Sequence, residues 1–211
     1  MTKPLEDTSQ RILKCAKQEF LEKGFSDASL RTIAAKAGTT TGSIYSRFGG
    51  KEELYAAIVE PAADHVAGMF EEIQKEFHQM DATEQSKLLE SYATSGMEQM
   101  LDYIYDHFEE FQILLDASYG TKFQDFVEHL VELETEYTYK YLDTIRFQKE
   151  GSILTREFTH IMNKALFESY FEVVRHKMPK EKAVPYIRML EQYHYAGWNS
   201  IFRSATGESD T

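Results

Sequence analysis

The sequence predicts an all-α protein of about nine helices, in which an N-terminal three-helix segment precedes a larger helical domain. Proline and glycine are scarce, with 4 Pro and 11 Gly in 211 residues, whereas the turns of an all-β sandwich need more of both. Apolar residues recur at the three- and four-residue spacings of amphipathic helices. Hydrophobic residues make up 42% of the chain and charged residues 27%, which is typical of a folded globular protein.

The first helix is predicted at about residues 9–23. Its apolar stripe contains Ile12, Ala16 and Phe20, which are spaced four residues apart and therefore lie on one face. Gly24 follows, and glycine tolerates the left-handed backbone conformation that ends many helices. This helix is expected to bury its stripe against the helices that come next.

Two short helices follow, and a glycine separates them. Asp27 or Ser29 can cap the first of these, which Gly38 ends after about two turns. A threonine hydroxyl can cap the next helix, predicted at 41–48 and ended by Gly49. Two short helices joined by a tight turn after a longer helix form a helix-turn-helix. At 1.5 Å per residue the third helix is about 12 Å long, which suits a DNA major groove about 12 Å wide.

The distribution of charge agrees with an anionic partner at the N-terminal end. The formal net charge is −12, but residues 1–55 hold 9 Lys and Arg against 7 Asp and Glu. The rest of the chain holds 14 basic against 28 acidic residues. A mildly basic segment on an acidic body indicates that the first quarter of the chain would meet a nucleic acid.

The helix-turn-helix segment closely resembles the DNA-binding domain of the TetR (tetracycline-repressor-like) family. The resemblance runs without a gap from Arg11 to Leu54 and covers the first quarter of the chain. Its motif consists of Arg11-Ile12-Leu13, Phe20, Gly24-Phe25, Ser29–Ala34, Ala37-Gly38, Gly42–Tyr45, Phe48 and Lys51–Leu54. The resemblance implies a homodimeric transcriptional regulator, usually a repressor that a small ligand releases from DNA. It divides the chain into a DNA-binding domain at 1–52 and a ligand-binding and dimerisation domain at 53–211.

The resemblance also implies which residues contact double-stranded DNA. Ser29 and Arg31, at the start of the second helix, would touch phosphates, and Lys51 would add another contact at the start of the fourth. Tyr45 would contact the DNA backbone or a base methyl group. Arg47 replaces the histidine common in the family, which leaves its partner open between a phosphate and a guanine. The full predicted set is Ser29, Arg31, Thr39, Thr40, Thr41, Gly42, Ser43, Tyr45, Ser46, Arg47 and Lys51.

The remaining three quarters of the chain are predicted to be helical without a recognised motif. A long fourth helix, shared by the two domains, is expected at 51–78. The later helices are a fifth that begins near Asp81 or Thr83 and runs to about 106, a short one through Phe108–Leu115, one at 122–148 that ends near Gly151, one at 155–176 and one at 181–204, with a polar tail from Gly207.

The last two helices predict a dimer interface. On the final helix, apolar and small residues recur at spacings of 3, 4, 3 and 4, which suits close helix packing. Packing into the subunit's own core would explain the same spacing. The resemblance to the TetR family implies that these two helices form a four-helix bundle across a dimer axis. We favour the dimer, because a palindromic operator needs a twofold partner. The predicted interface residues are Phe158, Ile161, Ala165, Ser169, Ile187, Leu190, His194, Gly197 and Ile201.

Aromatic residues concentrate between Tyr103 and Phe147 and predict a mostly apolar pocket for a small apolar or aromatic effector. Core packing explains aromatics at helical spacing without any ligand, and for each individual residue a core or surface position is favoured over the pocket lining. The acidic body would favour a cationic ligand, although a charge run such as Glu132, Glu134 and Glu136 is typical of a solvated surface. The candidate pocket residues are Met100, Tyr103, Phe111, Tyr119, Phe123, Phe126, Tyr137 and Tyr141.

No enzymatic activity, metal or cofactor is expected. The sequence contains no P-loop, GxGxxG, GxSxG or HExxH motif. Two E-x-x-H pairs, Glu157/His160 and Glu191/His194, supply half the ligand set of a di-iron helical bundle, but chance accounts for pairs in a chain so rich in Glu. Two alternatives remain: a helical-bundle metalloenzyme, and a dimeric small-molecule-binding protein without DNA recognition.

The sequence also predicts a cytoplasmic location. No apolar run approaches the roughly 18 residues of a membrane-spanning helix, and the polar N-terminus lacks the apolar core of a signal peptide. The single cysteine, Cys15, cannot form an internal disulfide.

Overall fold

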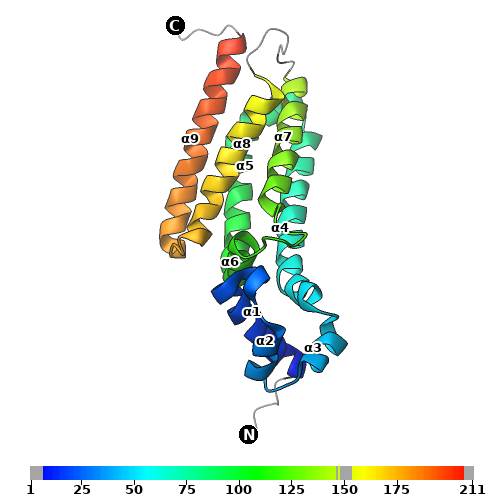
Figure 1. The fold of residues 1–211 in the computed structure, drawn as a ribbon. Helices are drawn as coiled ribbons and strands as arrows, with labels where there is room; N and C mark the ends of the chain where they lie inside the picture. Colours follow the sequence, from blue (N-terminus) through cyan, green and yellow to red (C-terminus); the bar gives the residue numbers. More distant parts are fainter. Residues whose placement is uncertain (1–6, 146, 148–153, 207–211) are drawn as a thin grey trace. The chain divides into compact units, whose positions relative to one another are not determined.

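A computed structural model describes residues 7–145, 147 and 154–206, with side chains up to residue 202. Within these residues all regular secondary structure is helical, which confirms the predicted fold class (Figure 1). The helices are α1 (Thr8–Asp27), α2 (Leu30–Lys36), α3 (Thr41–Phe48), α4 (Lys51–Gln79), α5 (Ala82–Asp106), α6 (Phe108–Asp116), α7 (Phe126–Thr144), α8 (Arg156–Arg175) and α9 (Lys180–Thr206).

The chain folds into two compact units. The first comprises Met1–His65 and His107–Phe126, and the second comprises Val66–Asp106 and Val127–Thr211. The first unit therefore holds α1, α2, α3 and α6 with the beginning of α4, which is more of the chain than the helix-turn-helix motif covers. The domain boundary at residue 52, drawn from the motif, stays a prediction.

Side-chain caps explain where the two short helices begin. The Ser29 hydroxyl accepts a hydrogen bond from the backbone N–H of Thr32 at 3.4 Å and caps α2. The Thr40 hydroxyl accepts from the N–H of Ser43 at 3.2 Å and caps α3. Gly49, with φ +95°, ends α3 in a backbone conformation that favours glycine. The third helix thus has the range that the sequence predicts.

The start of α7 differs from the prediction. This helix begins at Phe126, four residues later than expected, because the preceding residues form turns. There the Thr121 hydroxyl oxygen accepts a hydrogen bond from the N–H of Phe123 at 3.1 Å, a local bond that competes with helix formation. The helix ends at Thr144, before the predicted end at about residue 148, because the chain turns at residue 145. Gly151 and the polar tail from Gly207 lie outside the described residues.

A buried carboxylate connects α1 to both ends of α2. Glu19 has no exposed surface, and its carboxylate accepts hydrogen bonds from Nζ of Lys23 at 2.8 Å, Nζ of Lys36 at 3.1 Å and the N–H of Ser29 at 3.4 Å. Ser29 precedes α2 and Lys36 is its last residue. The hydrogen bond from Lys23 is the largest influence on the pKa of Glu19 and lowers it, although burial acts in the opposite direction. Three donors therefore compensate the buried charge.

Tyr55 of α4 organises the rest of the first unit. Its hydroxyl donates to the carbonyl oxygen of Ile113 in α6 at 2.9 Å, and burial raises its pKa. Its ring packs edge-on against the rings of Phe20 and Phe25, with centroids 5.1 and 5.3 Å away. The N–H of Phe25 donates to the carbonyl oxygen of Ala117 at 3.1 Å. Helices α1, α4 and α6 thus meet around one aromatic cluster.

In the second unit, α9 packs against both α5 and α8, and α8 and α9 lie side by side in Figure 1. The hydroxyl of the fully buried Tyr170 in α8 donates to the carbonyl oxygen of Met97 in α5 at 2.8 Å. At the surface, Nε of Arg188 in α9 donates to the carboxylate of Glu98 in α5 at 2.5 Å. These contacts align the helices that surround the cavity described below.

Replacing Glu19 with Gln is expected to lower the free energy of unfolding by about 1–3 kcal/mol near pH 7, because a neutral amide cannot compensate two ammonium groups. Folding lowers the pKa of Glu19 from 4.5. Ionised Glu19 therefore stabilises the fold at pH values above 4.5. As the pH falls below 4.5, the difference in the free energy of unfolding between wild type and variant becomes smaller.

The measurement is chemical denaturation followed by circular dichroism at pH 7 and at pH 4. Glu22→Gln is the matched control, since Glu22 faces Lys36 at 3.7 Å but leaves 62% of its side chain exposed. Its effect should stay within about 0.5 kcal/mol. Equal destabilisation by the two substitutions would contradict the role of Glu19.

Candidate functional site

The predicted DNA-contact residues lie at the surface of the first unit. Ile44 has no exposed surface and turns the opposite face of α3 toward the core, whereas Tyr45 leaves 58% of its surface exposed. The other exposed members of the predicted set are Arg31, Thr40, Gly42, Ser46 and Arg47, and the half-buried members are Ser29, Thr39, Thr41, Ser43 and Lys51. The surface that carries these residues is rich in hydroxyls and small side chains.

The two capping hydroxyls keep a donor for a further partner. Ser29 and Thr40 each use the side-chain oxygen to accept a backbone N–H. A hydroxyl that accepts one hydrogen bond still has its own O–H to donate, for example to a phosphate oxygen. The unpaired N–H groups in the first turn of α3 add further donors and the positive end of the helix dipole. This arrangement favours contact with an anion.

Lys51 has a partner within the first unit. Its Nζ donates to the carbonyl oxygen of Ser26 at 2.9 Å and lies 4.8 Å from the centroid of the Phe25 ring. Burial lowers the pKa of Lys51, partly offset by Asp27. An ammonium has three N–H donors, so this contact leaves capacity for a phosphate while it also ties α4 to the end of α1.

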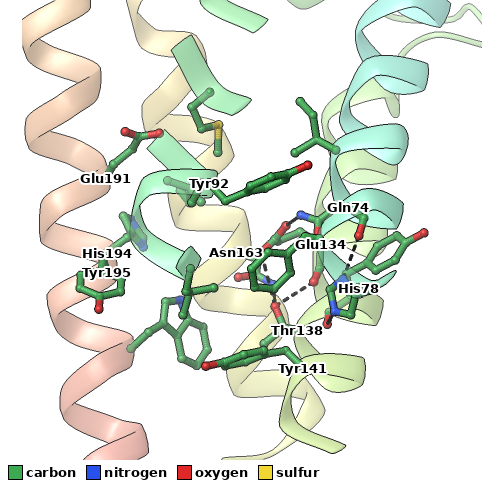
Figure 2. A pocket seen from close by; sticks show the side chains of 18 of the residues that line it. Gln74, His78, Tyr92, Glu134, Thr138, Tyr141, Asn163, Glu191, His194 and Tyr195 are labelled. Carbon is green, nitrogen blue, oxygen red and sulfur yellow. Dashed lines mark hydrogen bonds between the residues drawn. The ribbon is translucent and has the colours of Figure 1, made fainter. Parts of the chain in front are cut away.

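A cavity of about 160 Å³ lies within the second unit, and five helices line it: α4, α5, α7, α8 and α9 (Figure 2). Most of its lining is apolar or aromatic, as is usual for small-molecule sites. A cavity of about 150 Å³ binds a single aromatic ring in other proteins. The polar lining residues are Gln74, His78, Glu134, Thr138, Asn163, Glu191 and His194.

Of the predicted pocket residues, Tyr137 and Tyr141 line this cavity and the other six do not. Four of the six belong to the first unit, where they pack into its core or, like Tyr119 at 83% exposure, face solvent. The residues outside the cavity are Met100, Tyr103, Phe111, Tyr119, Phe123 and Phe126. The concentration of aromatic residues along the chain includes two residues that line the cavity. The segment at 107–126, however, belongs to the first unit, so its aromatic rings do not line a cavity in the second unit.

A network of hydrogen bonds runs along one wall of the cavity. Nε2 of Gln74 in α4 donates to Oε2 of Glu134 in α7 at 2.6 Å. The Thr138 hydroxyl lies 2.8 Å from the carbonyl oxygen of Glu134 and receives a hydrogen bond from Nδ2 of Asn163 in α8 at 3.4 Å. Burial raises the pKa of Glu134 to about 7, and Thr138 offsets part of that rise. The carboxylate of Glu134 thus accepts a hydrogen bond from within the chain, from Gln74.

The expectation that the acidic run in α7 is a solvated surface is wrong for its middle member. Glu132 and Glu136 are exposed, but Glu134 lines the cavity. Residues two apart on a helix point to nearly opposite sides. Helix geometry therefore explains why Glu134 is half-buried while Glu132 and Glu136 are exposed.

His78 connects α4 to α7 beside this network. Its Nδ1 lies 2.9 Å from the carbonyl oxygen of Gln74, and its Nε2 lies 3.1 Å from the carbonyl oxygen of Tyr137. A neutral imidazole has one N–H and can donate to one of these oxygens, whereas a protonated ring donates to both. Figure 2 shows His78 on the same side of the cavity as Gln74.

Glu191 in α9 is a buried carboxylate without such support. It is 8% exposed, and neither carboxylate oxygen has a hydrogen-bond partner among the residues that the structure describes. Burial raises the pKa of Glu191 to about 7; the nearby Glu98 adds to the rise, and Thr94 and Arg188 offset part of it. One turn further along α9, burial lowers the pKa of His194. In the sequence, Glu191 stands out only as part of an E-x-x-H spacing.

The E-x-x-H pairs do not assemble into a larger cluster. Within the described ranges, no group of three or more His, Cys, Asp or Glu residues is placed to hold a metal ion. Glu157 is exposed, and Nε2 of His160 lies 3.1 Å from Oε1 of Glu128. In the same ranges, the helices are too short or too polar to span a bilayer.

The predicted dimer residues divide between the surface and the interior of the second unit. Ile161, Ala165 and Gly197 are exposed. Ile187 has no exposed surface and packs in its own subunit's core, and His194 lines the cavity. The half-buried members of the predicted set are Phe158, Ser169, Leu190, His194 and Ile201. Much of the 3-4-3-4 seam on α9 therefore packs inside its own subunit instead of being free for a partner.

The two large exposed apolar side chains of α9 lie beside that seam rather than within it. Met189 is 71% exposed and Tyr193 is 76% exposed. Together with Ile161 of α8, which is 57% exposed, and the exposed small residues Ala165, Ala196 and Gly197, they make up what we term the α8–α9 face. Neither of the two large α9 residues belongs to the predicted seam.

The three helices at the N-terminal end define a helix-turn-helix protein, and the second helical unit contains a cavity. The sequence model of "Bacterial regulatory proteins, tetR family" matches residues 12–58. The helix-turn-helix segment of this chain is therefore similar to the DNA-binding segment of the tetR family, and the match spans about a quarter of the chain.

Individual relatives extend this result. The transcriptional regulator SrpR of Pseudomonas putida is 46% identical over 54 residues, which are 26% of this chain and 25% of SrpR. The transcriptional repressor KstR2 of Rhodococcus jostii is 30% identical over 144 residues, 64% of this chain and 60% of KstR2. SmeT, the repressor of the Stenotrophomonas maltophilia efflux pump SmeDEF, has the same fold, with a TM-score of 0.61, 19% identity, and coverage of 91% of this chain and 90% of SmeT.

The raised pKa of Glu191 predicts a pH-dependent gain in stability for Glu191→Gln. Folding raises this pKa from 4.5 to about 7, so the folded protein binds more protons than the unfolded chain between these values. Its stability therefore falls as the pH rises through that window. The Gln variant should exceed wild type by about 1–3 kcal/mol above pH 7 and match it near pH 4.5.

Urea denaturation at pH 5 and at pH 8 measures this difference. Glu132→Gln, which removes an exposed carboxylate on α7, should show no such pH-dependent gain. A Glu191→Gln protein that is less stable than wild type at pH 8 would show that the carboxylate has a compensating partner.

Proposed function

We propose that this chain is a ligand-responsive homodimeric transcriptional repressor that binds a palindromic operator in the DNA major groove. The observation that carries the proposal is the surface of α3: Ile44 anchors one face, while Tyr45, Ser46 and Arg47 remain exposed on a helix short enough for the groove. The match of residues 12–58 to the tetR family supports the same conclusion.

The proposed contacts divide into positioning and sequence reading. Ser29 and Arg31 would bind phosphates and set the register of the unit on DNA. Tyr45 would contact the DNA backbone or a thymine methyl group, and Arg47 would bind either a phosphate or a guanine edge. Lys51 would add a phosphate contact through the donors that Ser26 leaves free. The small residues at the start of α3 would allow close approach of the backbone.

The proposed dimer forms through the α8–α9 face. Its exposed Tyr193, Met189 and Ile161 would be buried on association, which supplies a hydrophobic driving force. A Cβ at Gly197 would meet no atom within 4 Å, so the partner's helix could approach this position closely. Dimerisation of this kind would present two copies of α3 to two half-sites about 34–36 Å apart.

Release from DNA would follow from a shift in population. A ligand in the cavity that binds better to a second dimer geometry, with a different separation of the two α3 helices, lowers DNA affinity by its differential affinity. Helix α4 contributes residues to both units and is the proposed connection. SmeT and KstR2, both described as repressors, support repression as the outcome.

Selection of bound duplexes from a random-sequence library, followed by sequencing, tests the DNA-binding part directly. Recovery of a palindrome with regularly spaced half-sites is the expected result. Sequence-independent binding, or none, in ligand-free buffer would favour a dimeric small-molecule-binding protein without DNA recognition.

Tyr45→Ala should abolish specific binding to the selected operator, a loss of at least about tenfold, and should leave the dimer intact. Fluorescence anisotropy measures the first and size-exclusion chromatography with light scattering the second. Tyr119→Ala, which removes an 83% exposed tyrosine of the same unit, is the control and should bind normally. Loss of the dimer in Tyr45→Ala would count against the assignment.

Tyr193→Asp should convert the protein to a monomer at micromolar concentration, because it places a charge in the proposed apolar interface. Sedimentation velocity measures the change. Leu88→Asp alters a 41% exposed side chain of the same unit on α5 and should remain dimeric. A Tyr193→Asp dimer as tight as wild type would exclude the α8–α9 face.

A further inference from the structure

We propose that the cavity binds a small organic cation, a protonated amine or a quaternary ammonium on a ring-sized apolar body, with the Glu191 carboxylate as its counter-ion. This inference rests on the proposed function, in which the cavity is the effector site, and it names the chemical class of the effector. Three features of the cavity carry it: an uncompensated carboxylate, the charges around it, and the aromatic walls.

The Glu191 carboxylate lacks the compensation that buried charges normally have. It is 8% exposed and neither oxygen has a hydrogen-bond partner among the described residues. Burial of an unpaired carboxylate is costly, and a positive ligand that reaches it removes that cost. The nearest cation on the same helix, Arg188, donates to Glu98 at 2.5 Å. Thr94 and Arg188 lower the pKa of Glu191 only in part, so a cationic ligand at this carboxylate would add compensation that the described residues do not supply.

The other charges of the cavity favour a cation over an anion. No Lys or Arg is among its lining residues in the described part of the chain. A second carboxylate, Glu134, enters from α7, while Glu191 enters from α9 (Figure 2). Glu134 receives a hydrogen bond from Gln74 at 2.6 Å, so it has a donor that Glu191 lacks. An anionic ligand would meet two carboxylates and no fixed positive charge.

The aromatic walls suit an organic cation rather than a metal ion. Tyr92, Tyr141 and Trp198 line the cavity, and the faces of such rings attract ammonium groups while they also cover an apolar body. Trp198 stacks on Phe202 with ring centroids 5.7 Å apart, which holds the indole in place. The cavity volume of about 160 Å³ suits a body of one aromatic ring.

The chain provides its own optical probe for a test. Trp198 is the single tryptophan of the sequence and lines the cavity, so its fluorescence reports occupation directly. We would titrate the full-length protein with three compounds that share a phenyl ring: benzyltrimethylammonium, its uncharged carbon isostere neopentylbenzene, and phenylacetate. The cation should give a saturable change, and the other two should bind at least about tenfold more weakly.

Glu191→Gln separates the charge from the shape of the site. The substitution should weaken benzyltrimethylammonium binding by about tenfold or more and leave neopentylbenzene unaffected. Glu132→Gln removes the same charge from an exposed position on α7 and should bind the cation like wild type. Equal affinity of wild type for the cation and its neutral isostere overturns the proposal, as does unchanged cation binding by Glu191→Gln or no binding of any probe at millimolar concentration.

The pH dependence gives a second readout. Benzyltrimethylammonium keeps its charge at every pH, so a change in its affinity reports on the protein alone. Wild-type affinity should rise between pH 6 and pH 8 as Glu191 ionises, and Glu191→Gln should lose that component. The variant leaves in place the other titratable or charged groups around the cavity and Glu191, which are His78, Tyr92, Glu98, Glu134, Tyr137, Tyr141, Tyr170, Arg188, His194 and Tyr195.

Failure of this inference can be told apart from failure of the proposed function. Operator binding is measured on the same proteins with and without the cation. If the operator is bound but the cation does not enter the cavity, the regulator stands and the effector class is wrong. If the cation binds through Glu191 but no operator is selected, the cavity is correctly assigned and the regulator is wrong.

Discussion

The helix-turn-helix depends on one buried carboxylate. Glu19 reaches from α1 to the N–H of Ser29, just before α2, and to Lys36 at the end of α2. Because both ends of a two-turn helix are held by the same acceptor, α2 has little freedom to rotate or slide on α1. The position of α3 then follows, since it packs on α2 through a short turn. A charge without exposed surface is affordable here because three donors surround it.

The second unit contains a buried carboxylate of the opposite kind. Glu191 is 8% exposed, and its carboxylate oxygens have no hydrogen-bond partner among the described residues. Burial raises the pKa of both carboxylates, but at Glu19 the hydrogen-bond donors outweigh burial and lower the pKa, whereas at Glu191 burial dominates and raises the pKa to about 7. A compensated charge contributes to the fold, and an uncompensated one stores free energy that a ligand can recover. The contrast separates a structural residue from a candidate binding residue of the same type.

Prediction from sequence succeeded where local chemistry decides. The range of α3 was predicted from a threonine cap and a terminal glycine, and both act as expected in Thr40 and Gly49. It missed Glu19, although a charged residue on the stripe of Ile12, Ala16 and Phe20 was visible as an exception to the pattern. Of the eight residues that were predicted to line a pocket, six lie outside the cavity in the structure. Those residues are aromatic and near the right helices, but helical spacing does not reveal which neighbour a face will meet.

The sequence by itself determined the fold class and the helix-turn-helix, because caps, glycines and apolar periodicity act over a few residues. Only the tertiary structure decided which residues line the cavity and which face of α9 remains exposed. Five helices from distant parts of the chain converge on the cavity, and their rotations depend on packing between side chains far apart in sequence. For the same reason Ile187 is buried while Tyr193 is exposed: a seam of apolar residues specifies a helix face, but only its neighbours determine whether that face is interior or surface.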